Sequence, residues 1–184
     1  MSEIPIIWDA CGLLNLAATA QAREILTALN CPSYVVAEVH AAEVLFLRPL
    51  PEEDPQGNLV EMDLSELFSA GLLEEVSLTA AEEELFVRYA QEVDDGEART
   101  AAAAVSRGWR VATDDRAAIR LLRSLTLPPP VVTTPDWLKQ WADTGQLDAT
   151  SLGDVLQRVE LCTRYRPRRI HPLCDWWNGK LIHP

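Results

Sequence analysis

Acidic side chains follow two of the apolar runs that the sequence predicts as buried strands. Asp9 comes directly after the first run, and Asp114 and Asp115 come directly after a later one. Glu38 and Glu97 each lie near the start of a predicted helix. Because ligands bind beyond the carboxyl ends of the strands in an open α/β sheet, we expect these carboxyl groups to gather at that edge.

A cluster of carboxylates in one cleft repels itself unless some are protonated or a cation lies among them. Oxygen ligands without histidine or cysteine suit Mg²⁺ or Mn²⁺. A carboxylate-held ion of this kind can activate water and stabilise an in-line displacement at phosphorus. The pattern therefore predicts metal-dependent hydrolysis of a phosphodiester.

Strands that alternate with helices must position these acids. The predicted strands cover residues 4–8, 72–78, 109–113 and 131–133, and residues 30–33 hold a brief strand or turn. The predicted helices cover residues 11–18, 21–29, 34–47, 64–70, 79–92, 98–107, 116–125 and 135–143, with Ser33 as the cap of the third. This alternation favours a parallel sheet with helices on both faces.

The alternation weakens after residue 144. We therefore predict an α/β domain over residues 1–143 and a C-terminal extension over 144–184, with one helix at 152–163 and an irregular stretch at 164–184. The charge also changes: residues 1–150 hold 25 acids and 10 bases, whereas residues 151–184 hold three acids and six bases. The extension is thus the basic part of an acidic chain.

The composition excludes several classes of protein. The chain has 184 residues, 48% of them apolar, which is enough for one globular core. A net charge of −12 argues against a general coat for nucleic acid or membrane surfaces. No apolar run approaches the ~20 residues of a membrane span, no basic start resembles a signal peptide, and the four cysteines form no close pair. We expect a cytoplasmic protein.

Four segments resemble the PIN domain, the metal-dependent ribonuclease fold of VapC-type toxins. They are IIWDACGLLNL at the first strand, SYVVAEVHAAEV around the second acid, DDGEARTAAAAVSRGW around the third and WRVATDDRAAIRLL around the fourth. Together they span residues 4–122 in the order of the family. The resemblance implies a three-layer fold with a central, mainly parallel sheet flanked by helices.

The resemblance also implies a set of site residues. Asp114 is a further candidate metal ligand, Thr113 would position the fourth acid by hydrogen bonding, and Asn15 would face the site from the first helix. Many relatives carry one more acid where this chain has Ala117, so a second metal site would be weak or absent. The implied catalytic acids and ligands of Mg²⁺ or Mn²⁺ are Asp9, Glu38, Glu97 and Asp115.

The function implied is that of an endoribonuclease, in which metal-bound water hydrolyses RNA. Many relatives are toxins that a cognate antitoxin neutralises, and they act as homodimers. The alternative is a PIN-fold binding module without strong activity, which docks a protein or RNA through its C-terminal tail. The missing acid at Ala117 and the long extension favour this alternative, whereas the retention of four acids argues against it.

Several of these acids have a simpler structural interpretation. Asp9 could cap the following helix, and the spacing of Asp94 and Glu97 matches a capping box. Glu43 competes with Glu38 for the second acid, but it lies roughly 7 Å further along the predicted helix, away from the sheet edge.

Arginines supply the candidate contacts to RNA phosphates. Arg116, Arg120 and Arg123 share one helix face, which could also be merely solvated, and the first two are the candidates. A second cluster beside Tyr165 could pair with nucleic acid, with an acidic partner or with the acidic body of the protein itself. Its members are Arg164, Arg166, Arg168 and Arg169, of which the last three are candidate RNA contacts.

Overall fold

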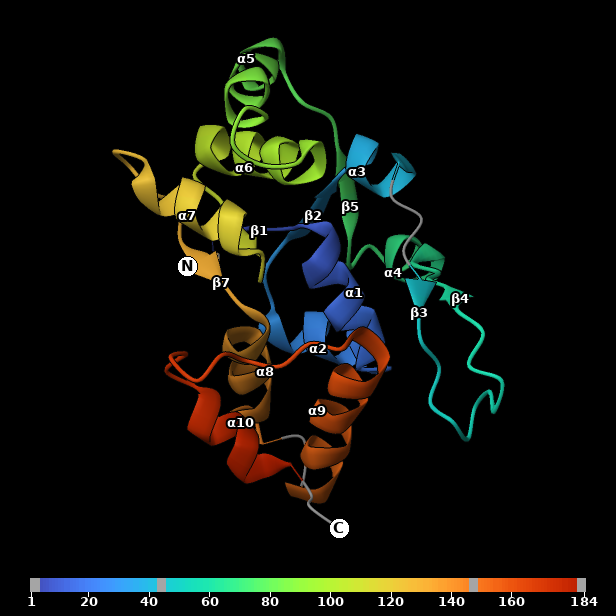
Figure 1. Ribbon diagram of the computed structural model, residues 1–184. Helices are drawn as coiled ribbons and strands as arrows, with labels where there is room; N and C mark the ends of the chain where they lie inside the picture. The colour runs from blue at the N-terminus through green and yellow to red at the C-terminus, as the bar shows by residue number, and fades with distance from the viewer. Residues whose placement is uncertain (1–3, 43–45, 146–148, 182–184) are drawn as a thin grey trace.

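The computed structural model describes residues 4–42, 46–145 and 149–181 and shows a parallel sheet between layers of helices (Figure 1). The sheet has the strand order β5-β2-β1-β6-β7, and every neighbouring pair is parallel. Its strands are β1 (Ile6–Trp8), β2 (Ser33–Val36), β5 (Glu74–Val76), β6 (Arg110–Ala112) and β7 (Val131–Val132). A separate antiparallel pair consists of β3 (Phe46–Leu47) and β4 (Val60–Glu61).

Helices connect the strands of the sheet and cover both of its faces, as the alternation in the sequence predicts. They are α1 (Ala10–Ala18), α2 (Ala22–Leu29), α3 (Ala37–Ala42), α4 (Ser65–Ser69), α5 (Ala80–Tyr89), α6 (Asp95–Arg107), α7 (Arg116–Ser124), α8 (Thr134–Ala142), α9 (Ala149–Thr163) and α10 (Cys174–Lys180). The prediction of an α/β fold with a parallel sheet between helices is confirmed. None of the helices in the described part of the chain is both long and apolar enough to cross a bilayer.

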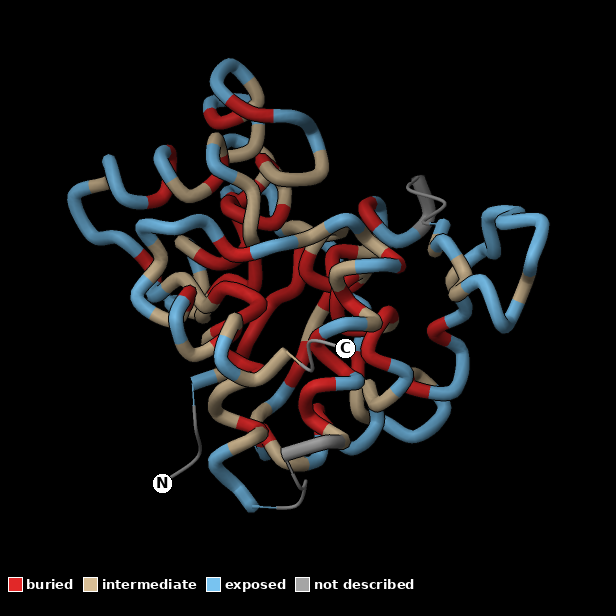
Figure 2. Tube along the Cα trace, turned by 60° about the horizontal axis from the view of Figure 1, so that its bottom comes forward, coloured by how far each residue is buried: buried red, intermediate tan, exposed pale blue. Residues whose placement is uncertain are grey.

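The central strand β1 divides the interior into two cores, because successive side chains of a strand point to opposite faces. Ile6 and Trp8 pack with residues of α1, α2, α8 and α9, whereas Ile7 packs with residues of α5, α6 and α7. Figure 2 shows the buried residues concentrated along the strands and on the inner sides of the helices. All three side chains of β1 are at most 1% exposed.

The segment that follows β1 and α2 differs from the predicted helix at 34–47. Residues 34–36 continue β2, which pairs with both β1 and β5, and α3 begins only at Ala37. Tyr34, Val35 and Val36 are aromatic or β-branched and suit a strand buried between two neighbours better than a helix. Residues 46–47 form β3, and Glu43 lies outside the described residues.

The C-terminal extension packs onto one of the two cores. Leu156 and Val159 of α9 belong to the core that contains Trp8, and α10 replaces part of the irregular stretch predicted at 164–184. Trp177 of α10 is completely buried, and its Nε1–H donates to Glu160 Oε1 at 2.8 Å. Its indole thus supplies the apolar anchor that allows this short helix to form.

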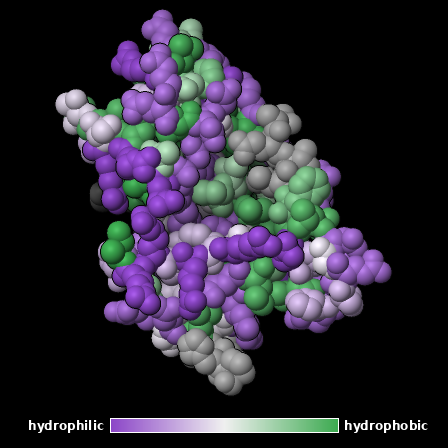
Figure 3. All heavy atoms as spheres, viewed as in Figure 1, coloured by the Kyte–Doolittle hydropathy of each residue, from purple (hydrophilic) through white to green (hydrophobic). Residues whose placement is uncertain are grey.

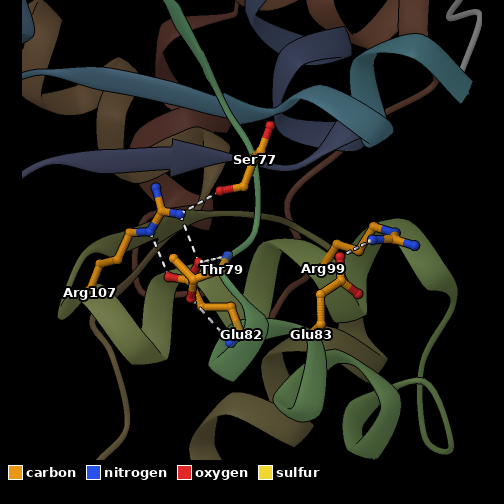
Figure 4. A network of polar contacts seen from close by, with 6 residues as sticks. All are labelled: Ser77, Thr79, Glu82, Glu83, Arg99 and Arg107. Carbon is orange, nitrogen blue, oxygen red and sulfur yellow. Dashed lines mark hydrogen bonds and ion pairs between the residues drawn. The ribbon is translucent and has the colours of Figure 1, made fainter.

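A buried ion pair joins α5 to the end of α6 (Figure 4). Glu82 is only 1% exposed, and its Oε1 accepts from Arg107 Nε at 2.6 Å while Oε2 accepts from Nη2 at 2.8 Å. Glu82 Oε2 also accepts from the backbone N–H of Thr79, which completes a capping box. The Arg107 guanidinium holds the pKa of Glu82 down at about 2.

We expect Glu82→Gln to lower the free energy of unfolding by about 2 kcal/mol at pH 7, because charge-assisted hydrogen bonds to Arg107 are lost. Since folding lowers the pKa of Glu82, this contribution is present above pH 4.5 and disappears as the pH falls toward 2. Urea unfolding at pH 7 and pH 3 measures it. Glu83→Gln is the control, because its 3.3 Å pair with Arg99 is longer and much more accessible to solvent than that of Glu82. Equal losses in both variants would contradict the prediction.

Candidate functional site

The carboxyl ends of β1 and β6 lie side by side and bring three acids to the same edge. Trp8 pairs with Ala112 in the parallel register, and the backbone N–H of Asp9 donates to Ala112 O at 3.1 Å. Asp9 therefore follows β1 where Thr113 and then Asp114 follow β6. This is the edge at which the sequence predicts the acidic site.

Asp9 is a buried carboxylate that begins α1. It is 3% exposed, and its Oδ1 accepts from the backbone N–H of Gly12 at 2.7 Å, so it is the N-cap of the helix. The thiol of Cys11 donates to both carboxylate oxygens, at 3.2 and 3.3 Å. Burial raises the pKa of this thiol, which keeps it protonated as a donor. Capping and a chemical role thus coincide at Asp9.

The pKa of Asp9 is raised to about 7, chiefly because burial disfavours its charged form. The hydrogen bonds from Thr113, Gly12 and Cys11 oppose this rise, and the nearby charge of Asp114 adds to it. A cation at Asp9 would offset both the cost of burying the charged carboxylate and the repulsion from Asp114. A bound cation would therefore stabilise the charged form of Asp9.

Gly12 lets the start of α1 approach the end of β6. A Cβ at this position would meet Ala112 O at 2.7 Å, which is too close for the backbone to accept without moving. We expect Gly12→Ala to lower the free energy of unfolding by about 1–3 kcal/mol. Gly179→Ala is the matched control, because a Cβ on this helical glycine would meet nothing within 4 Å. Thermal unfolding compares the two, and equal stability of both variants would show that the close approach does not matter.

Asp114 is held by donors from three other parts of the chain. Asn15 Nδ2 donates to its Oδ2 at 3.2 Å, and Thr134 donates through its backbone N–H at 3.2 Å and its hydroxyl at 2.5 Å. Tyr165 is a further polar neighbour, whose hydroxyl favours the charged form of this carboxylate. Burial raises the pKa of Asp114, and these donors oppose the rise. With its oxygens so engaged, Asp114 is better placed to fix the loop than to bind a metal ion.

Asp115 begins α7, and Thr113 holds it. Its Oδ1 accepts from the backbone N–H groups of Ala117 and Ala118 at 2.5 and 2.9 Å, and Oδ2 takes part in neither bond. Thr113 Oγ1 accepts from the backbone N–H of Asp115 at 3.1 Å. Asp9 and Asp115 are therefore both N-caps of helices that start at paired strand ends.

Glu38 and Glu97 are placed differently. Glu38 is exposed in the first turn of α3, after β2. Glu97 is in the first turn of α6, where its Oε2 accepts from the backbone N–H of Asp94 at 3.3 Å in the capping box that the spacing predicts. Over residues 4–42, 46–145 and 149–181, no three His, Cys, Asp or Glu side chains form a group that could hold a metal ion. The structure thus does not bring the four implied acids together in one cluster.

The donor set still fits a hard divalent cation. Mg²⁺ is commonly held by only one or two carboxylates, with water and substrate phosphates completing its shell. Asp9 and Asp115 supply carboxylates at paired strand ends, and Asp9 is buried beside the like charge of Asp114. The donor types at this edge are therefore those that Mg²⁺ or Mn²⁺ prefers.

The candidate arginines are all on the surface. Arg116 and Arg120 are exposed in the first half of α7, next to Asp115. Arg166 is exposed and forms a 3.2 Å ion pair with Glu160, and Arg168 and Arg169 are exposed as well.

Three residues of the site carry no prediction from the sequence. Thr134 could have been found, because it comes just after β7, which lies next to β6 in the sheet. Cys11 lies two residues beyond Asp9, and this short spacing could have predicted a contact between the two side chains. Tyr165 had no local signal, because only the packing of the extension brings it to Asp114. Comparison with family models, curated proteins and solved structures gave no match for the chain.

Proposed function

We propose that the protein is a metal-dependent endoribonuclease, which hydrolyses RNA phosphodiester bonds at the carboxyl edge of its sheet. The observation that carries the proposal is the buried Asp9, which lies beside Asp114 where β1 and β6 end. Asp9 and Asp115 would hold Mg²⁺ or Mn²⁺, with Glu38 and Glu97 as further candidates. The ion would supply an activated water and offset charge on the phosphate.

The residues of the chain orient the carboxylates. Gly12 and Cys11 donate to Asp9, and Thr113 fixes the backbone at Asp115. Arg116, exposed at the start of α7, would pair with a substrate phosphate. An antitoxin partner, a homodimer and a cytoplasmic location stay predictions from the resemblance and the composition.

A second candidate function is a binding module that has little or no activity. It is favoured by the capping role of Asp9, Asp115 and Glu97, each of which accepts from backbone N–H groups at a helix start. It is also favoured by the exposure of Glu38 and by the fact that the described residues contain no group of three possible metal ligands. Metal binding separates the two candidates.

The test is a titration of Mn²⁺ into the metal-free protein, followed by thermal unfolding. The nuclease proposal predicts a saturable stabilisation, about 2.7 kcal/mol at a hundredfold excess over Kd, which Asp9→Asn and Asp115→Asn abolish. Asp154→Asn, an exposed acid of α9, is the control and should respond like the wild type. Absence of stabilisation in the wild type, with and without an RNA oligonucleotide, would favour the binding module.

A further inference from the structure

An arginine-rich stretch of the extension runs from α9 toward α10 and is tied to the carboxyl ends of β6 and β7 (Figure 1). We call residues 164–171 the arginine segment. Its first tie is Tyr165, which packs against Trp177 and lies near Asp114 just after β6. Its second tie is His171, whose Nε2 lies 3.0 Å from the Oγ1 of Thr133 just after β7.

The first tie is built from both the ring and the backbone of Tyr165. The ring meets the buried Trp177 edge-on, with centroids 5.7 Å apart. The backbone N–H of Tyr165 donates to Thr163 Oγ1 at 3.2 Å, and Arg164 turns the chain away from α9 in the left-handed conformation, with φ 58°. These contacts hold Tyr165 near Asp114, so the segment starts beside the acidic site.

The second tie fixes the other end through a short chain of hydrogen bonds. His171 Nδ1 accepts from the backbone N–H of Leu173 at 3.1 Å, which leaves the hydrogen on Nε2. Nε2–H then donates to Thr133 Oγ1, whose own hydrogen goes to Asp136 Oδ2 at 2.6 Å. Thr133 is the N-cap of α8, so the segment ends on a rigid element beside the site.

Between and beside these ties are four exposed arginines. Arg166 pairs with Glu160, but Arg164, Arg168 and Arg169 form no ion pair with any described residue. Figure 3, in the same view as Figure 1, shows strongly hydrophilic residues where this segment crosses the molecule. The chain as a whole has a net charge of −12. Exposed guanidinium groups at the edge of the acidic site therefore form a local positive patch that can bind an anionic ligand.

We propose that Tyr165 and His171 fasten the arginine segment beside the acidic site, so that its arginines bind the RNA phosphates next to the bond that is cleaved. Arginine suits this role because its planar guanidinium binds phosphate through two hydrogen bonds. The inference rests on the proposed nuclease function for the identity of the anion. It adds that Tyr165 is a positioning residue, whose neutral hydroxyl sets where the positive charges lie.

The first test measures binding of a fluorescent single-stranded RNA oligonucleotide by anisotropy, in EDTA and over a range of salt concentrations. For Arg168→Gln with Arg169→Gln, we expect weaker binding and a salt slope smaller by about 1.4, because each lost phosphate contact removes about 0.7. Arg88→Gln with Arg23→Gln is the control with the same change in net charge, placed on the exposed surfaces of α5 and α2. Equal losses of RNA affinity in the two double variants would overturn the inference. A protein that binds an acidic peptide but not RNA through these arginines would overturn it as well.

The second test uses Tyr165→Phe, which keeps the ring against Trp177 and changes no charge. We expect RNA binding at least about threefold weaker and faster hydrogen exchange at the Thr134 amide, which donates to Asp114. If Tyr165→Phe changes neither RNA affinity nor hydrogen exchange at the Thr134 amide, the proposed role of Tyr165 is overturned. Circular dichroism checks that the variant is folded.

These measurements are made without metal, so they can refute this inference without refuting the nuclease proposal, and the reverse. RNA binding that depends on the arginine segment, in a protein that neither binds Mn²⁺ nor cleaves RNA, would support this inference and refute the nuclease. A protein that cleaves RNA but binds it equally well without Arg168 and Arg169 would do the reverse.

Discussion

Asp9→Asn is expected to reduce Mn²⁺-dependent RNA cleavage by at least about a hundredfold while the protein stays folded. Asparagine is as good an N-cap as aspartate, so its carbonyl oxygen can keep the 2.7 Å hydrogen bond from Gly12. What is lost is the negative charge on the buried carboxylate that would hold the ion. Digestion of an end-labelled RNA, with initial rates over a range of Mn²⁺ concentrations, measures the effect.

Asp154→Asn serves again as the control and should cleave at the wild-type rate, since Asp154 is exposed on α9. If Asp9→Asn kept a tenth or more of the wild-type rate, Asp9 would be a capping residue only, and the site would have to be sought elsewhere. A rate that fell together with the melting temperature would point to the cap rather than to the metal.

The free energy of unfolding of the metal-free protein is expected to fall as the pH rises from about 4 to about 7. Folding raises the pKa of Asp9 from 3.8 to about 7, so the folded protein binds more protons than the unfolded chain across this range. The largest contribution is about 4 kcal/mol, three units at 1.36 kcal/mol each. Asp9 is 3% exposed, so solvent screens this effect little.

Urea unfolding in EDTA at pH 5 and pH 8 measures this dependence. In Asp9→Asn the titrating group is gone, so the variant should show a much weaker dependence and exceed the wild type in stability at pH 8. Mn²⁺ at pH 8 should stabilise the wild type and leave the variant unchanged. The same pH dependence in both proteins would contradict burial of an ionisable carboxylate at this position.

The sequence predicts the framework of the site well, because strand ends are local features. Apolar runs that stop at Asp9 and at Asp114 mark where the buried strands end. Parallel pairing of β1 with β6 then brings these two ends to the same edge of the sheet. The capping box of Asp94 and Glu97 is equally local, since it depends on a spacing of three residues. Features of this kind need no knowledge of distant parts of the chain.

Features that depend on distant contacts were predicted wrongly or not at all. Residues 34–36 were assigned to a helix, because only the neighbours β1 and β5 show that they are a central strand. The stretch before residue 184 was predicted as irregular, because α10 depends on burial of Trp177 against α9. Tyr165 and Asp114 are about fifty residues apart in sequence, and no short-range pattern connects them.

The packing of the extension also changes how its role can be tested. Removal of residues 164–184 would be the simplest test of the extension. Because Trp177 is fully buried and Tyr165 reaches Asp114, such a truncation would disturb both the core and the site. Substitutions of single side chains are therefore the cleaner experiment.

The contact between Tyr165 and Asp114 has a consequence for the synthesis of the protein. A ribosome makes the chain from the N-terminus, so Asp9 and Asp114 are present long before Tyr165 emerges. The acidic edge can therefore receive its last support only when nearly the whole chain has left the ribosome. If the protein cleaves RNA, its acidic edge would therefore stay without this support while the chain is still attached to the RNA-rich ribosome.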